Sequence, residues 1–446
     1  MIKILGLSRR KFLTASIFGM IGSGMISRSK ELNAKEQEAS EVPKIKEYRT
    51  LGRTGFKVSD ISAGVTTDVS LLNALLDSGI NYIDTSESYA GGRIEETVGE
   101  AIRDRDRKSL FITTKTSDHS DSRKLSKEDV TKEGFLRRIR RSLERLQTDY
   151  IDCIMFSDAE SVDSLKQEGF HAAVRQLKEE GRVKYVGISH HGSEWHEDRK
   201  ETMEEILLAA AEDGRFDVML LVYNYLKQDM SERVLRVSRE KNIGTTLMKT
   251  EPARLYYGTK QWLETQEKEG KEVEEGIRKT LRELKGKIDE AQGFYNEYNL
   301  KTPAEIRNAS IRFVLSNSDV NTACISFRNY DDLKNYIMLS GSRLTSKDES
   351  LLRAYSQKCG SLYCRHACGL CESECPHKVP VNAIMRYDHY FEAQGREKYA
   401  MKKYATLPTA KADTCLSCSG PCQNACPYGV PVQGLLIHAH QIMTLA

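Results

Sequence analysis

The chain has 446 residues, of which 39% are hydrophobic and 29% charged, a balance that supports packed domains and excludes wholesale disorder. Its 67 lysines and arginines against 64 aspartates and glutamates leave a net charge of +3, too even to favour nucleic acid as a partner. No apolar run reaches the roughly 18 residues that a transmembrane helix needs, so no stable membrane span is expected.

The N-terminal segment has the layout of a secretory signal. Residues 8–14 read SRRKFLT, with Arg9 and Arg10 adjacent, and a weakly apolar stretch follows over residues 15–26. The motif resembles a twin-arginine (Tat) export signal, which is read by a receptor and directs the export of folded proteins with their cofactors in place. The resemblance implies a periplasmic or other extracytoplasmic location, with residues 1–26 as the signal and residues 27–45 as a polar linker.

Residues 46–345 alternate short apolar runs with amphipathic helical patterns, which predicts an α/β body. Eight runs are predicted to be strands: residues 61–64, 80–84, 110–114, 151–156, 185–189, 218–222, 244–248 and 322–325. Eight strands with crossover helices favour a closed (β/α)8 TIM barrel. A doubly wound open sheet is the alternative, but no G-x-G-x-x-G motif follows the first strand. A hairpin over Tyr48–Val58 is expected to close the barrel bottom, and a charged helical insertion over residues 251–300 to lie near the catalytic face.

Five segments of this body, in order along the chain, resemble signatures of the aldo/keto reductase family. They are YRTLGRTGFKVS from Tyr48, GINYIDTS from Gly79, YAGGRIEETVGE from Tyr89, SLERLQTDYID from Ser142 and GIS from Gly187. The resemblance implies an oxidoreductase that acts on small carbonyl or alcohol substrates with a nicotinamide cofactor.

The family's chemistry needs a proton donor beside a carbonyl group while the nicotinamide delivers hydride. Asp84 and Lys115 end the second and third strands and Tyr89 follows the second, so all three are expected at the carboxyl-terminal face. By resemblance, Tyr89 is the acid/base. Lys115 and Asp84 tune it, because a nearby ammonium lowers a tyrosine pKa from its usual value near ~10. The alternative is a structural ion pair beside a packed tyrosine.

The end of the fourth strand departs from the family pattern. The family usually has a histidine there that orients the substrate carbonyl, whereas this chain reaches Ser157. Serine donates a hydrogen bond but has a shorter reach and no cationic form, which puts ordinary carbonyl reduction in question. His190 and His191, after the fifth strand, either enter the same mouth or lie at the surface.

The resemblance also implies three cofactor contacts. Ser189 would meet the nicotinamide carboxamide, Tyr223 would stack under the ring, and Arg328 would hold the phosphate on the adenosine. Arg328 favours NADP(H) over NAD(H). The Pro-Gly pair that is usual in the family at the turn after the eighth strand is missing. The alternative is therefore that the protein binds no nucleotide.

Nine of the eleven cysteines fall between Cys359 and Cys426, and eight of these form two groups that each end in Cys-Pro. Three closely spaced thiolates can cover one face of an iron–sulfur cube, and a fourth, followed by its proline, can reach a second cube. The predicted ligand sets of two [4Fe–4S] clusters are therefore Cys364, Cys368, Cys371 and Cys426, and Cys415, Cys418, Cys422 and Cys375.

Residues 346–446 resemble the two-cluster bacterial ferredoxins, with a longer helical connection over residues 383–404. We therefore expect a small, mainly helical ferredoxin-like iron–sulfur domain after the barrel. Two zinc sites or four disulfides are rivals, although zinc sites usually pair knuckles of two cysteines and disulfides do not explain two Cys-Pro endings.

Together these features predict an exported aldo/keto reductase-type oxidoreductase that couples carbonyl/alcohol chemistry to a redox electron carrier through two [4Fe–4S] clusters. The alternative is a non-catalytic electron-transfer or binding protein on a degenerate barrel.

Overall fold

The computed structural model describes residues 43–118, 125–157, 159, 161–190, 201–252, 259–265, 275–366, 368–392, 394–407 and 410–444. The predicted export signal and nearly all of the linker lie outside these residues. Residues 44–446 form one compact unit. Among the helices of the described residues, none combines the length and the apolar character that crossing a bilayer requires.

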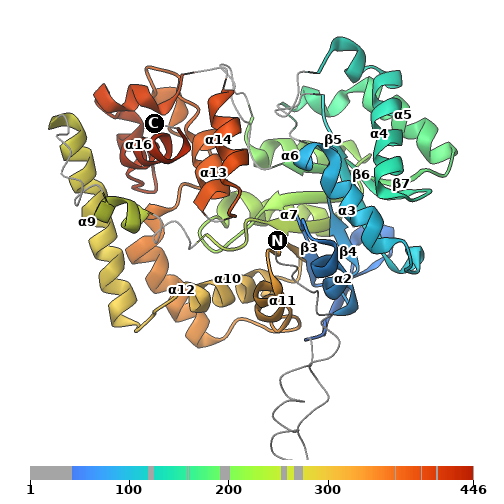
Figure 1. Ribbon diagram of the computed structural model, residues 1–446, viewed down its shortest axis with the longest axis horizontal. Helices are drawn as coiled ribbons and strands as arrows, with labels where there is room; N and C mark the ends of the chain where they lie inside the picture. The colour runs from blue at the N-terminus through green and yellow to red at the C-terminus, as the bar shows by residue number, and fades with distance from the viewer. Residues whose placement is uncertain are drawn as a thin grey trace, which may run out of the picture. The chain divides into compact units, whose positions relative to one another are not determined.

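Eight parallel strands close a barrel in the order β10-β3-β4-β5-β6-β7-β8-β9 (Figure 1). Their bounds are β3 Ile61–Ala63, β4 Tyr82–Asp84, β5 Phe111–Thr116, β6 Ile151–Ser157, β7 Val183–His190, β8 Val218–Val222, β9 Gly244–Met248 and β10 Thr322–Ile325. Each observed strand overlaps one predicted strand, and the ring closes where Ala323 pairs with Ile61. The barrel prediction is confirmed, and the open sheet is excluded.

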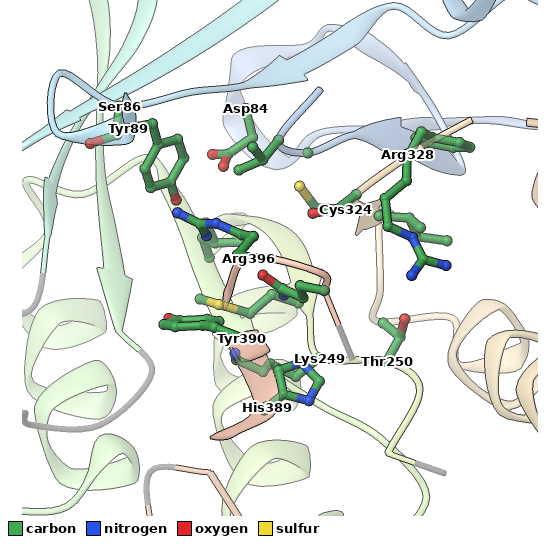
Figure 2. A pocket seen from close by; sticks show the side chains of 18 of the residues that line it. Asp84, Ser86, Tyr89, Lys249, Thr250, Cys324, Arg328, His389, Tyr390 and Arg396 are labelled. Atoms are coloured by element: carbon green, nitrogen blue, oxygen red, sulfur yellow. The ribbon is translucent and has the colours of Figure 1, made fainter. Parts of the chain in front are cut away.

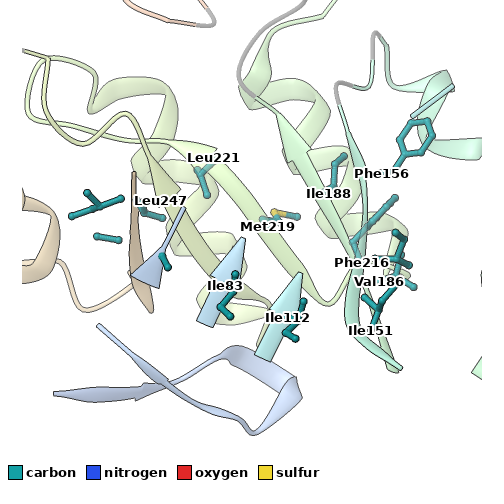
Figure 3. Close-up of a cluster of buried hydrophobic side chains, with 14 of the residues drawn as sticks. Ile83, Ile112, Ile151, Phe156, Val186, Ile188, Phe216, Met219, Leu221 and Leu247 are labelled. Carbon is teal, nitrogen blue, oxygen red and sulfur yellow. The ribbon is translucent and has the colours of Figure 1, made fainter. Parts of the chain in front are cut away.

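Amphipathic helices follow the strands and cover the outside of the barrel. They are α2 Val69–Asp77, α3 Arg93–Ile102, α4 Lys132–Leu146, α5 Glu168–Glu179, α6 Met203–Asp213, α7 Asp229–Glu240, α10 Ala304–Ser316 and α11 Tyr330–Ile337. Outward strand residues such as Ile83 and Ile112 pack into the core beneath these helices (Figure 3). Because successive strand residues point to opposite faces, Tyr82 and Phe111 instead pack in a smaller cluster with Met155 and Leu220.

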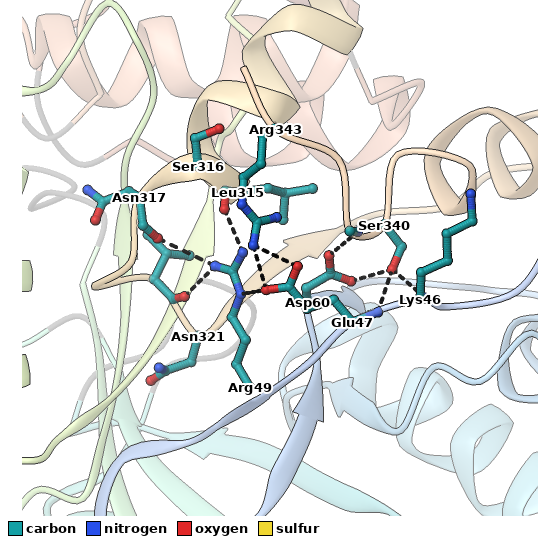
Figure 4. Close-up of polar contacts among 12 residues, drawn as sticks. Lys46, Glu47, Arg49, Asp60, Leu315, Ser316, Asn317, Asn321, Ser340 and Arg343 are labelled. Atoms are coloured by element: carbon teal, nitrogen blue, oxygen red, sulfur yellow. Dashed lines mark hydrogen bonds and ion pairs between the residues drawn. The ribbon is translucent and has the colours of Figure 1, made fainter. Parts of the chain in front are cut away.

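The predicted N-terminal hairpin is present as β1 Tyr48–Thr50 and β2 Lys57–Ser59, which pair antiparallel. Arg49 donates hydrogen bonds to the carbonyl oxygens of Leu315 at 2.5 Å and Val320 at 2.7 Å (Figure 4). A Cβ atom at Gly52 would lie 2.2 Å from the backbone nitrogen of Gly244, so only glycine fits where the hairpin turn meets the first residue of β9. The hairpin therefore covers the amino-terminal end of the barrel.

A second core joins the insertion to the cysteine-rich region. Its helices are α9 Glu275–Glu297, α12 Ser346–Cys359, α13 Val381–Glu392, α14 Glu397–Ala405, α15 Pro421–Asn424 and α16 Val432–Met443. Helix α9 confirms the helical prediction for the insertion and packs against α12 and α16. Trp262 donates a hydrogen bond to Gln441 at 3.1 Å, and Thr280 donates one to Gln433 at 3.2 Å. The insertion thus supports the cysteine-rich region, which is mainly helical as expected.

Candidate active site and cysteine centres

A cavity opens where the barrel strands end at their carboxyl termini. Strand alternation turns Asp84 and Lys115 toward the barrel interior, on the same side as Tyr82 and Phe111. Six of the residues singled out from the sequence line this cavity: Asp84, Tyr89, Lys115, Ser157, Ser189 and Arg328.

The predicted catalytic residues lie together. The Lys115 Nζ atom is 2.6 Å from both carboxylate oxygens of Asp84 and donates a further hydrogen bond to the Thr85 carbonyl at 2.8 Å. The same nitrogen lies 5.0 Å from the centroid of the Tyr89 ring. The side chains of Lys115 and Asp84 are only 3% and 5% exposed, so solvent does not screen this pair.

Burial and charge act in opposite directions on these groups. Burial alone would lower the pKa of Lys115, but the Asp84 carboxylate raises that pKa above its usual value, which keeps the ammonium charged. Burial raises the pKa of Tyr89 and outweighs the lowering by Lys115. The sequence-based expectation of a lowered Tyr89 pKa is therefore wrong, because desolvation is the larger effect. At neutral pH, Tyr89 carries its proton and can act as a donor.

The backbone after Tyr89 fixes its position. Ala90, Gly91 and Gly92 have φ angles of 51°, 69° and 96°, and helix α3 begins at Arg93. Two of these three left-handed residues are glycines, which adopt such angles without a Cβ clash. The turn therefore places the tyrosine at the strand end, immediately before the helix leaves the cavity.

The fourth barrel strand lacks the terminal histidine that is usual in the family. Ser157 ends β6 and lines the cavity in its place. His190 ends β7 and is fully buried, but it is not among the lining residues. His191 lies outside the described residues.

The three predicted nucleotide contacts differ in their positions. Ser189 and Arg328 line the cavity, and Arg328 Nε lies 3.0 Å from an Asp332 oxygen. Tyr223 does not line it. Its hydroxyl group instead accepts a hydrogen bond from Asn317 at 3.1 Å and donates one to Glu232 at 3.3 Å. The stacking role predicted for Tyr223 is therefore wrong, because the side chain packs toward helices α7 and α10.

The two predicted contacts that do line the cavity are chemically suited to a nucleotide. The Ser189 hydroxyl group can bond a carboxamide, and the Arg328 guanidinium can bond a phosphate.

The opposite wall of the cavity comes from residues that the sequence did not single out. It is formed by His389 and Tyr390 of α13, by residues 394–396 and 399, and by Lys249 after β9 (Figure 2). The position of Lys249 directly after the seventh barrel strand was a usable signal. The contribution of residues 389–399 depends on how the cysteine-rich region packs, and no local pattern encodes that packing.

The cysteine side chains meet in the two predicted sets. One small cavity is lined by Cys364, Cys368, Cys371 and Cys426. Burial, together with the unfavourable charge interaction between a Cys364 thiolate and the other three cysteines of that set, raises the pKa of Cys364. Burial and the proximity of Cys422, Cys375 and Cys418 likewise raise the pKa of Cys415, to about 12. Each set therefore takes its fourth thiol from the other sequence group.

The surroundings of these thiols fit iron–sulfur clusters. The backbone N–H groups of Val379 and Gly420 donate to the sulfur atoms of Cys375 at 3.3 Å and Cys418 at 3.4 Å. Such donors stabilise thiolate ligands and tune cluster potentials. All eleven cysteines are free thiols, so the four-disulfide alternative is not formed. Four thiols gathered at one place suit a cation or cluster that binds them as thiolates.

Several curated proteins are similar to parts of this chain in sequence. The oxidoreductase YqkF of Bacillus subtilis (strain 168) is 32% identical over 149 residues, which are 32% of this chain and 48% of the relative. The aldo-keto reductase YhdN of the same organism is 25% identical over 215 residues, 45% of this chain and 61% of the relative. L-galactose dehydrogenase of Arabidopsis thaliana is 31% identical over 159 residues, 32% of this chain and 48% of the relative. The chain thus spans about half the length of these curated relatives.

Among solved structures, the holo form of aldo-keto reductase AKR11C1 from Bacillus halodurans aligns with a TM-score of 0.49 at 20% identity, over 69% of this chain and 95% of that chain. The profile of the aldo/keto reductase family matches residues 50–356, which include every strand of the barrel and end before the eight clustered cysteines. The chain therefore belongs to the aldo/keto reductase family.

Proposed function

We propose that this protein is an exported oxidoreductase of the aldo/keto reductase type, which couples a carbonyl/alcohol reaction at Tyr89 to an electron carrier through two [4Fe–4S] clusters. The observation that carries the proposal is the contact between the first cysteine set and the catalytic cavity. His366, which lies between Cys364 and Cys368, has its ring centroid 4.9 Å from that of His389, which lines the cavity.

Helix α13 supplies a second link between the two sites. Its first residues, Val381 and Asn382, line the cavity of the first cysteine set, and His389 and Tyr390 line the catalytic cavity. Eight residues of helix separate these positions, or about 12 Å along the axis at 1.5 Å per residue. A cluster held by the first set would therefore lie one short helix segment from the wall of the catalytic cavity.

Each residue of the site has a defined part in this proposal. Tyr89 donates its proton to the carbonyl oxygen in reduction and takes it back in oxidation. Lys115 stabilises the phenolate form, and Asp84 holds Lys115 charged. Ser157 has a hydroxyl group that can donate to the same oxygen. The nicotinamide, when bound, supplies or accepts hydride, with Arg328 favouring NADP(H), and the clusters supply or accept single electrons.

The test uses holoprotein purified anaerobically in its folded form. Small alcohols and carbonyl compounds are added, and the oxidation state of the clusters is followed by visible absorbance. We expect at least one compound to change it in the wild type and none to do so in Tyr89→Phe, with Tyr298→Phe, an exposed tyrosine, as the matched control. Clusters that respond to no compound contradict the proposal. Mass spectrometry of nucleotide released on denaturation tells whether a resident NADP(H) takes part.

A second candidate function is electron transfer without catalysis on the barrel. The observation that favours it is Ser157 at the position of the family histidine. In that case the clusters would exchange electrons with a carrier protein, and Tyr89→Phe would leave this exchange unchanged.

A further inference from the structure

A lysine in the wall of the catalytic cavity stands out by its surroundings. Lys249 follows β9 with a φ angle of 58°, a left-handed conformation that is uncommon for residues other than glycine. Its Nζ atom is buried and has no hydrogen-bond partner among the described residues. The nitrogen lies 4.4 Å from the centroid of the Tyr390 ring, its one described cation–π contact. Burying an ammonium without an anionic partner is costly, so the position calls for a ligand.

A second cation lies in the same wall. The Arg396 guanidinium is 6.0 Å from the Tyr89 ring centroid, 5.3 Å from that of Tyr390 and 4.0 Å from that of Tyr399. Figure 2 shows it beside the hydroxyl end of Tyr89, on the side where Lys249 lies. No ion pair with Arg396 occurs in the part of the chain that the structure describes.

Among the described residues, neither acidic residue of the lining forms an ion pair with Lys249 or Arg396. Asp84 is paired with Lys115 at 2.6 Å, and Glu251 accepts a hydrogen bond from Tyr336 at 2.8 Å. Burial, with Arg386 and Arg396 nearby, holds the pKa of Lys249 well below its usual value. An anion between the two side chains would supply the missing opposite charge and the hydrogen-bond acceptors.

We propose that Lys249 and Arg396 form a subsite for a carboxylate of the substrate, so that the substrate pair is a hydroxy acid and the corresponding oxo acid. This inference rests on the proposed function, because it takes Tyr89 as the reacting centre. The Arg396 guanidinium lies 6.0 Å from the Tyr89 ring centroid and also belongs to the subsite. A carboxylate bound there would therefore lie close to the carbon that is oxidised or reduced. The phosphates of a nucleotide are the other source of such an anion, and Arg328, after β10, is the residue assigned to them.

Calorimetric titration of the holoprotein tests the subsite without requiring turnover. The probes are a panel of carboxylates from glycolate and pyruvate to gluconate, each beside its neutral methyl ester or amide, with NADPH in a separate arm. The variants are Lys249→Met and Arg396→Gln. The exposed Lys402→Met, also in the cysteine-rich region, is the matched control. Visible absorbance of the clusters reports whether each variant is folded and loaded.

We expect at least one carboxylate to bind more tightly than its neutral counterpart. Each of the two variants should weaken that binding about tenfold, or ~1.4 kcal/mol, while the neutral compound and Lys402→Met show no change. Equal binding of acid and ester, no carboxylate binding, or unchanged affinity in both variants overturns the inference. A loss confined to NADPH also overturns it and assigns the cations to the nucleotide. Carboxylate binding that persists while no compound changes the clusters contradicts the proposed function alone.

Discussion

The rings of His366 and His389 meet edge to face, with their centroids 4.9 Å apart and their planes at 71°. One ring belongs to the loop between two cysteines of the first set, and the other lines the cavity that holds Tyr89. This contact joins the cysteine-rich region to the catalytic face through side chains rather than through solvent.

Replacement of His389 by leucine tests this contact. The variant removes the ring and introduces an apolar side chain of similar size at a buried position, so we expect unchanged iron content and folding. Substrate-driven change in cluster absorbance, followed by stopped flow, should slow about tenfold, equivalent to ~1.4 kcal/mol in the barrier. The control is His440→Gln. His440 lies on α16 and shares a hydrogen bond with Tyr404. An unchanged rate in His389→Leu would show that electrons take another route.

Each cysteine set contains one cysteine from the other sequence group. Replacing that cysteine should therefore affect the cluster of the other group, whereas grouping by sequence alone predicts the opposite. Cys426 belongs to the second group in the chain but lies with Cys364, Cys368 and Cys371. Cys426→Ser should therefore perturb the cluster of the first group, and Cys375→Ser that of the second. Electron paramagnetic resonance of the reduced protein shows which cluster each variant perturbs. Iron analysis should give about eight atoms per chain in the wild type. Zinc without iron in the wild-type holoprotein would support the zinc alternative instead.

The pair of Lys115 and Asp84 should set the pH profile of the reaction. Removing Lys115 alone would leave a buried, uncompensated carboxylate, so the informative variant is Asp84→Asn/Lys115→Met. Lys115 lowers the pKa of Tyr89 more than Asp84 raises it, so the double variant should have a still higher tyrosine pKa. In the oxidative direction, the rise in rate with pH should shift to higher pH, and the rate near neutrality should fall by about 10²-fold or more. A profile that superimposes on the wild type removes Tyr89 as the titrating group.

Lys249 should destabilise the protein when no ligand is bound. Its pKa is lower in the folded chain than its usual 10.5, so between these two values the unfolded chain binds more protons and stability rises with pH. Lys249→Met removes this cost. We expect a higher melting temperature at pH 7, by roughly 2 °C or more, and a smaller difference at pH 9.5. A variant that melts below the wild type at pH 7 would indicate that the lysine has a stabilising partner.

The twin-arginine motif makes a prediction about location. Replacing Arg9 and Arg10 by lysine keeps the charge but removes the pair that the export receptor reads. We expect the variant to accumulate in the cytoplasm with its cysteine centres loaded, whereas the wild type is recovered outside it. Fractionation with immunodetection measures this, and equal export of both forms would contradict the assignment.

Much of the fold could be predicted because it is encoded locally. Each barrel strand is a short apolar run bounded by turn residues, and the order of the strands follows from the parallel barrel itself. Asp84, Tyr89 and Lys115 could be placed at one face for the same reason, since every parallel strand ends there. The cysteine sets followed from spacing and the closing prolines.

The sequence-based predictions failed where tertiary packing determines the position or the pKa of a side chain. Tyr223 follows β8 as expected, but hydrogen bonds to Asn317 and Glu232 turn its hydroxyl toward the outer helices. The direction of the Tyr89 pKa depended on how completely the cavity wall excludes water, which no motif reports. The role of Arg396 required knowing that the start of α14 lines the catalytic cavity. These three properties belong to long-range contacts, whose partners lie far apart in the chain.

The shared wall of the cavity has a consequence for maturation. Residues 389, 390, 394–396 and 399 complete the wall of the catalytic cavity, and they belong to the same region as the eight clustered cysteines. On the proposed function, cluster assembly in this region would also order one wall of the catalytic cavity. Catalysis would then depend on cluster assembly, although the clusters lie outside the cavity in which the substrate reacts.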